Sequence, residues 1–317
     1  MLAELGDTAL VATVLPQSAE VPSLVPGPRS VAWRYAGDAR LIATGAYAIL
    51  LQVAHPTVGA GVSEHSDFRA DPWGRLLRTL DYSYVMTYGG PELAMEMGGR
   101  IRQMHQGIKG VRPDGERYHA LEPGAYAWVH ATLAHSIVRG HELLGRPMSE
   151  ADIERFYAEW RRSGRLIGVR ERDLPEGWTA FRAYFDEMVT VQLQRTPAVE
   201  EVLEALESPA RPELQFLPER AWRLVRIPAV HQNALVTAGL LGPTLRDRFG
   251  VPWSRGKERE LRLLGAASRA ATPLLPPTVR NVGPRYLRWR REQIARGDAA
   301  APTRAPRQEH GELPVLT

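Results

Sequence analysis

The hydrophobic positions of this chain recur mostly at helical spacing. Between residues 91 and 108, apolar side chains and one histidine repeat every three or four positions, at Ala94, Met97, Ile101, His105 and Ile108. Such a stripe forms the buried face of an amphipathic helix. No segment alternates convincingly between apolar and polar residues, and no internal repeat is present. The pattern therefore predicts an all-α fold.

Capping residues, glycines and prolines mark where the helices begin and end. Asp71-Pro72 combines an N-cap residue with a proline at the first helical position, and Ser149-x-x-Asp152 is a second capping pattern. The expected helices span residues 37–54, 72–87, 91–108, 123–144, 149–163, 177–194, 198–206, 217–238, 255–271 and 282–296.

The chain divides into three parts by composition. Residues 1–29 contain four prolines without sustained periodicity, so we expect an irregular N-terminal arm. Residues 30–296 hold the helical pattern and are expected to form a single domain. Residues 297–317 mix alanine, proline and charged residues, which is typical of a disordered tail.

Composition excludes several kinds of site. The 317 residues are 44% hydrophobic, enough for a sizeable core, and include no cysteine. Disulfides, iron–sulfur clusters, thiolate-ligated haem and covalently attached haem are therefore excluded. The net charge of +4 fits either an anionic partner or a bias in base composition. We expect no nucleic-acid binding, because no platform of basic and aromatic residues accompanies the charge.

The sequence also gives an expectation for localisation. The first 16 residues carry acidic side chains where a signal peptide carries lysine or arginine. The most apolar stretch, Leu41 to Ala54, ends at His55-Pro56 and is shorter than the ~20 residues of a membrane span. We expect a cytoplasmic protein without a transmembrane segment.

Two of the expected helices carry candidate binding residues. The apolar stripe turns His105 inward, and Arg102 lies one turn earlier, where it would neutralise an anionic group. The helix from residue 72 places Arg75, Arg78 and Thr79 on one side, which suits an anionic or oxygen ligand. Both sets also have an ordinary interpretation, as a core histidine and solvated arginines, and spacing alone favours that interpretation.

A third candidate region, residues 52–66, concentrates small and polar side chains after the most apolar helix. Its Glu64 and His65 suit acid–base groups in a pocket wall, although a capped helix–loop connection explains them equally well. A helical di-iron site is disfavoured, because the single E-x-x-H pattern lies in a turn-rich segment. Fingerprints of hydrolases, P-loop NTPases and dinucleotide-binding folds are missing.

Four segments carry a family resemblance: GDARLI at 37–42, LLQVAHPTVGAGVSEHSDFRADPWGRLLRT at 50–79, RQMH at 102–105 and WVHATLAHS at 128–136. With these segments the chain resembles the DUF2236 family, which includes the latex-clearing rubber oxygenases and the fungal MpaB oxygenases. The resemblance spans residues 30–270. It implies a helical protein with a globin-like core that binds haem b through a histidine and uses dioxygen to cleave isoprenoid double bonds.

The resemblance also assigns roles to the candidate residues. The family's R-x-x-H falls on Arg102 and His105, which implies that His105 is the iron ligand and that Arg102 binds the cofactor. The R-x-x-K-T of the rubber oxygenases falls on Arg75, Arg78 and Thr79, on the opposite side of the haem. Arg78 replaces the lysine, and a guanidinium has no lone pair for iron, so a lysine-capped closed state is excluded.

From this resemblance we expect a haem b-dependent oxygenase, or a peroxide-using oxidase, acting on a small hydrophobic or isoprenoid-like substrate. Arg75, Arg78 and Thr79 would interact with dioxygen or peroxide, and Arg75 would also bind the cofactor. Glu64 and His65 are our candidates for proton transfer. Two alternatives stay open: a haem-binding carrier or gas or redox sensor without turnover, and a metal-free helical interaction protein.

Overall fold

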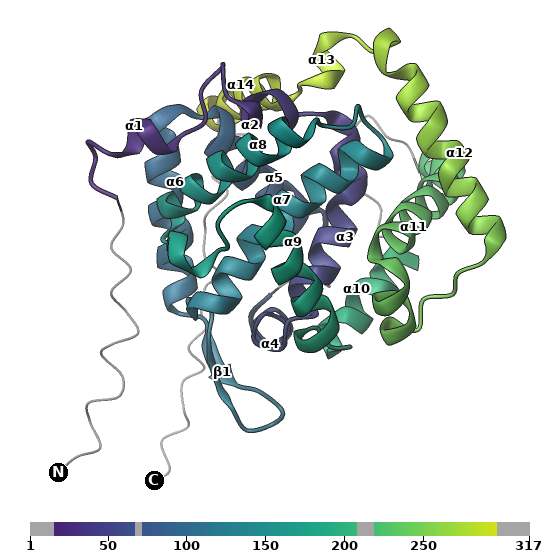
Figure 1. Ribbon diagram of the computed structural model, residues 1–317, viewed down its shortest axis with the longest axis horizontal. Coiled ribbons are helices and arrows are strands. Elements are labelled where there is room, and N and C mark those ends of the chain that lie inside the picture. The colour runs from purple at the N-terminus through teal and green to yellow at the C-terminus, as the bar shows by residue number, and fades with distance from the viewer. Residues whose placement is uncertain (1–15, 67–71, 208–218, 297–317) are drawn as a thin grey trace.

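The computed structural model describes residues 16–66, 72–207 and 219–296, and these residues are helical apart from one short hairpin and the connecting turns (Figure 1). The predicted all-α fold is confirmed. The α-helices are α1 (Val21–Leu24), α2 (Val31–Tyr35), α3 (Gly45–Val53), α4 (Pro56–His65), α5 (Pro72–Tyr88), α6 (Gly90–Gln106), α7 (Pro123–Leu143), α8 (Glu150–Ser163), α9 (Trp178–Glu187), α10 (Pro197–Glu207), α11 (Glu219–Phe249), α12 (Arg255–Ala271), α13 (Pro277–Arg280) and α14 (Gly283–Arg296).

Shorter elements connect these helices. Strands β1 (Lys109–Val111) and β2 (Arg117–His119) pair antiparallel. The 3-10 helices are Ala39–Thr44, Gly164–Ile167, Glu171–Asp173 and Thr272–Leu274, and a π-helix, Met188–Gln192, continues α9.

Several helix boundaries agree with the sequence pattern. The Ser149 hydroxyl accepts a hydrogen bond from the backbone N–H of Asp152 at 3.1 Å, so the predicted cap of α8 is confirmed. Within the N-terminal arm, the described residues 16–29 include α1, whose Val21 and Leu24 are buried. The expected cap at Asp71 and the expected tail 297–317 lie outside the described residues.

Three elements differ from the expectation. Pro56 ends the preceding helix and begins α4, because its fixed φ suits a first helical turn while its missing N–H cannot continue a helix. The segment expected as turns forms the β1–β2 hairpin, with Gly115 at a φ of +87° in its loop. The helix expected to stop at residue 238 continues as α11 to Phe249, through a kink at Gly242.

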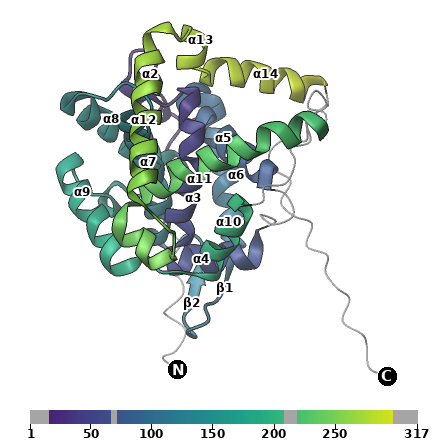
Figure 2. The ribbon, with the colours of Figure 1, turned by 90° about the vertical axis from the view of Figure 1, so that its right-hand side faces the viewer.

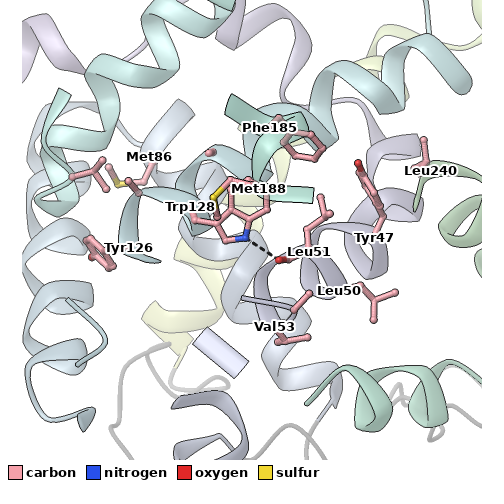
Figure 3. Close-up of a cluster of buried hydrophobic side chains, with 14 of the residues drawn as sticks. Tyr47, Leu50, Leu51, Val53, Met86, Tyr126, Trp128, Phe185, Met188 and Leu240 are labelled. Carbon is pink, nitrogen blue, oxygen red and sulfur yellow. Dashed lines mark hydrogen bonds between the residues drawn. The ribbon is translucent and has the colours of Figure 1, made fainter. Parts of the chain in front are cut away.

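The core lies where α3 meets α7. Trp128 of α7 is fully buried, and its indole Nε1–H donates to the Leu51 carbonyl of α3 at 2.8 Å (Figure 3). Helices α5 and α6 lie on one side of this centre, while α10, α11 and α12 lie on the other (Figure 1). The α4 end and the hairpin lie at one pole of the molecule, opposite α13 and α14 (Figures 1 and 2).

No single helix in the described ranges is long and apolar enough to cross a membrane. Residues Ala39–Val53 and Pro56–His65 pass by length and composition only as a pair bent by 106°.

Candidate functional site

His105 lies in the last turn of α6, and its ring is held by its own helix. The Nδ1 atom lies 2.7 Å from the carbonyl oxygen of Ile101. Because a carbonyl only accepts, Nδ1 carries the proton and Nε2 carries the lone pair. Nε2 makes no hydrogen bond to any residue that the structure describes. This is the tautomer and the orienting contact of a metal-binding imidazole.

The surroundings of His105 keep its ring neutral. Burial is the main cause of its lowered pKa, and the positive charge of Arg75 and the nearby His119 lower the pKa further. The ring packs edge-on against Tyr126 of α7, with 5.4 Å between the ring centroids. A neutral imidazole with an unengaged nitrogen is the form that binds a metal.

Arg75 of α5 is a partly buried cation whose hydrogen-bond partner is uncharged. Its guanidinium donates to the Ser66 hydroxyl at 2.6 Å, and no carboxylate among the described residues pairs with it. Burial lowers the pKa of Arg75 to about 10, and repulsion from Arg78 contributes. Arg75 therefore keeps its charge at neutral pH, and a desolvated cation of this kind favours an anionic ligand.

Arg78 and Thr79 follow Arg75 on α5 but differ from it in environment. Arg78 is exposed, and its charge acts on Arg75 through space. Thr79 is half-buried, and its hydroxyl donates to the Arg75 carbonyl at 3.0 Å. The Thr79 proton is thus used within the helix, which leaves its oxygen as an acceptor.

Glu64 and His65 lie together at the C-terminal end of α4, against the hairpin. The phenol of Tyr118 on β2 donates to Glu64 Oε2 at 2.5 Å, and His65 Nε2 lies 3.9 Å from Glu64 Oε1. The next residue, Ser66, is the one that binds Arg75. These contacts join the end of α4 to α5 and to β2.

Arg102 occupies a different environment from the other candidates. Arg102 is buried, with 8% of its surface exposed. It lines a recess of about 10 Å³, which has room for about one water molecule. The other lining residues include Leu121, Tyr126, Gly168 and Asp173. The charge of Arg102 also reaches the Tyr126 phenol, because it lowers the pKa that burial raises. Tyr126 therefore contacts His105 and borders the Arg102 recess.

The donor set suits a cofactor that needs one protein ligand. No group of three or more histidine, aspartate or glutamate side chains within the described ranges could hold a metal ion. A structural zinc or a di-iron centre needs several such ligands. Haem brings its own four nitrogen ligands, so one half-buried histidine with an unengaged nitrogen fits it.

Contacts across elements supplied the residues that sequence reasoning missed. Tyr118 and Tyr126 belong to no motif that marks them, and only the packing of β2 and α7 brings them to the candidates. His130 and His135, inside the WVHATLAHS segment, have core partners instead. His130 stacks on Trp160, and His135 bonds the Tyr47 phenol at 3.0 Å.

The fold is helical, and the site combines His105, whose ring is held by its own helix α6, with the half-buried Arg75 of α5. The chain belongs to the family described as the ER-bound oxygenase mpaB/B'/rubber oxygenase catalytic domain, whose model matches residues 33–270. The resemblance stated from the sequence segments is thereby confirmed, and the family is one of oxygenases.

Two relatives share similarity over most of the chain. The uncharacterized proteins Mb2261 of Mycobacterium bovis and Rv2237 of Mycobacterium tuberculosis are each 29% identical over 232 residues, which cover 72% of this chain and 87% of theirs. No solved structure is significantly similar.

Proposed function

We propose that this protein is a haem b-dependent oxygenase for a small hydrophobic, isoprenoid-like substrate, with His105 as the iron ligand. The observation that carries the proposal is the state of the His105 ring, which donates from Nδ1 to Ile101 and leaves Nε2 without a partner among the described residues. Membership of an oxygenase family supports the class of reaction, and all the candidate residues lie within the matched range 33–270.

The protein's own groups bind and orient. Haem b, when bound, supplies redox chemistry with dioxygen or peroxide that protein side chains lack. The Ile101 carbonyl fixes the rotation of the His105 ring, so that Nε2 keeps one direction. Arg75 donates hydrogen bonds to anionic oxygens, either of a cofactor carboxylate or of the oxidant. Arg102, a buried cation one turn before His105, is the second group assigned to a cofactor carboxylate.

Proton transfer is assigned to the end of α4. Glu64 Oε2 accepts a hydrogen bond from the Tyr118 hydroxyl. Burial, and then the contact with Glu64, raise the pKa of this phenol, so Tyr118 keeps its proton. Glu64 is thus the carboxylate available to take a further proton, and the neighbouring His65 is the group that exchanges protons with solvent. Thr79 contributes an acceptor oxygen, and Arg78 contributes positive charge at the exposed side.

The ligand assignment is tested by replacing His105 with alanine. We expect the wild-type protein to bind about one haem b per chain and show a Soret band, and His105→Ala to lose most of the bound haem while its helical circular dichroism persists. His119→Ala is the matched control, because its ring is also near His105 but its Nδ1 already accepts the Leu121 N–H at 3.0 Å. A wild-type spectrum from His105→Ala would refute the assignment.

Turnover separates the oxygenase from a carrier or sensor. The reduced, haem-loaded protein is mixed with dioxygen or peroxide and an apolar lipid extract, and oxidised products are sought by mass spectrometry. We expect products that His105→Ala does not form. A stable complex with the oxidant and no product from any extract would instead favour a carrier or sensor.

A further inference from the structure

One segment near the C-terminal end has an unusual charge distribution. Residues 261–291 contain seven arginines and no aspartate or glutamate, although Glu260 and Glu292 flank them. These seven charges exceed the net charge of the whole chain, +4, so the rest of the chain is net acidic. The segment covers most of α12, all of α13 and much of α14.

Some of these arginines have structural partners and others do not. Arg290 pairs with Asp81, and Arg269 donates to the Leu143 carbonyl. Arg280, Arg285 and Arg288 are exposed and make no hydrogen bond or ion pair with any described residue. These three charges therefore contribute nothing visible to holding the fold together.

Large apolar side chains lie exposed among the same residues. Leu274, between α12 and α13, is 86% exposed, and Trp289 on the outer face of α14 is 46% exposed. Pro273, Pro276 and Pro277 around Leu274 are exposed as well. Helices α13 and α14 lie along one edge of the molecule, with the C-terminal end of α12 leading into them (Figure 2).

We propose that this edge, formed by Leu274, Arg280, Arg285, Arg288 and Trp289, binds the surface of a membrane that contains anionic lipid. Guanidinium groups attract and hydrogen-bond lipid phosphates, while tryptophan and leucine insert at the level of the headgroups. A nucleic acid would match the charge, but it offers no apolar layer for a leucine that protrudes between prolines.

Two further features agree with a surface of this kind. The five residues lie beyond residue 270, outside the range that the family model matches, so the surface is separate from the residues assigned to the cofactor. Helix α14 is fixed to α5, since Asp81 accepts from Tyr286 at 2.6 Å and from Arg290 at 3.1 Å. Arg285, Arg288 and Trp289 are thus presented on a helix that is docked on α5, and Arg280 ends the preceding helix α13.

The test is sedimentation of the full chain with vesicles of phosphatidylcholine, with and without 30% phosphatidylglycerol. We expect binding only to the anionic vesicles and a loss of binding at high salt. The triple variant Arg280→Glu, Arg285→Glu, Arg288→Glu should bind at least roughly 100-fold more weakly, because each basic side chain near an anionic surface contributes about a fivefold factor. Leu274→Ser, at a side chain that is 86% exposed, should weaken binding without affecting the fold.

The matched control carries the same charge change elsewhere. Arg155, Arg162 and Arg182 on α8 and α9 are also exposed, and none of them has a partner among the described residues. Their triple replacement by glutamate should keep vesicle binding within about threefold of the wild type. The proposal would be overturned if both triple variants lost vesicle binding equally, or if the Arg280, Arg285 and Arg288 variant bound vesicles as well as the wild type. Binding of the wild type to nucleic acid but not to vesicles would overturn it too.

Discussion

At the scale of single residues, His130 shows how the fold keeps a titratable group neutral. It is 3% exposed on α7, its Nε2–H donates to the Trp160 carbonyl at 2.8 Å, and its ring stacks on the Trp160 indole. Trp160 returns a bond from its indole N–H to the His130 carbonyl at 3.0 Å. Burial lowers the pKa of His130 to about 4, and the bond to Trp160 offsets only part of that effect.

This pKa predicts a loss of stability in acid. Above pH 6.5, the ordinary pKa of histidine, the ring is neutral in both the folded and unfolded states, and its stabilising contribution is complete. As the pH falls toward 4, the unfolded chain takes up a proton that the folded protein excludes. Between pH 7 and pH 4.5 we expect the free energy of unfolding to fall by about 2–3 kcal/mol more in the wild type than in His130→Gln, measured by urea denaturation.

Two outcomes decide this prediction. Between pH 7 and pH 8 the two proteins should lose or gain stability in parallel, because neither side chain titrates there. Equal losses down to pH 4.5 would mean that His130 takes up its proton in the folded state.

Sequence reasoning found some residues of the candidate site and missed their partners. His105 was found because its position on the apolar stripe and its R-x-x-H context agree. Tyr118 and Tyr126 were missed, since each acts through a contact between elements distant in sequence, and no local pattern encodes such a contact. The roles given to His105, Arg102, Arg75, Arg78, Thr79, Glu64 and His65 stay predictions.

At the scale of elements, α6 is positioned by a close backbone contact. A Cβ atom at Gly98 would overlap the backbone carbonyl oxygen of Leu166, in the 3-10 helix Gly164–Ile167. The adjacent Gly99 has no atom within 4 Å of such a Cβ. The absence of a side chain at residue 98 therefore lets α6 approach its neighbour.

Two matched substitutions test this contact. In an open helix interior, alanine is more stable than glycine by about 1 kcal/mol, so Gly99→Ala should raise the free energy of unfolding by roughly 0.5–1 kcal/mol. Gly98→Ala should lower it by about 1–3 kcal/mol, because the carbonyl of Leu166 is backbone and cannot rotate away. The measurement is urea denaturation of both variants. Stabilisation by both would show that the Leu166 backbone yields easily.

Helices with strong caps and stripes were predicted well, and irregular elements were not. The cap at Ser149 places the start of α8 within one residue. The π-helix Met188–Gln192 was missed, because it depends on Arg248 of α11, which donates to the carbonyls of Val189 and Thr190 within it and of Leu193 just after it. A tertiary contact of this kind does not change the spacing of hydrophobic residues in the local sequence, so that spacing cannot predict it.

At the scale of the whole molecule, the C-terminal helix is bound to N-terminal elements. The backbone N–H of Val282 donates to the Gly37 carbonyl at 2.7 Å, and Leu287 of α14 is 5% exposed. The acid-free run is visible in the sequence, but only the fold brings α13 and α14 to one edge of the molecule (Figure 2). That the chain forms a single domain over residues 30–296 stays a prediction.

Asp81 is the residue through which this arrangement is best tested. Its side chain is 3% exposed, and its carboxylate accepts hydrogen bonds from Tyr286 and Arg290 of α14. The Arg290 side chain is 17% exposed. Replacing Asp81 with alanine removes a buried carboxylate that accepts from both Tyr286 and Arg290, so Asp81→Ala should lower the free energy of unfolding by about 3 kcal/mol. Trypsin should also cut faster at the arginines of α14, and the rate of cleavage measures how often the helix detaches.

The control is an exposed ion pair within a single helix, which links no two elements. Glu142→Ala removes an exposed carboxylate that pairs with Arg139 within α7. It should change stability by less than about 0.5 kcal/mol and leave the trypsin rate unchanged. Asp81→Asn keeps an acceptor for Tyr286 but loses the charge, so it should fall between Asp81→Ala and the wild type. If Asp81→Ala behaves like Glu142→Ala, the contacts of Asp81 are not what holds α14 on the molecule.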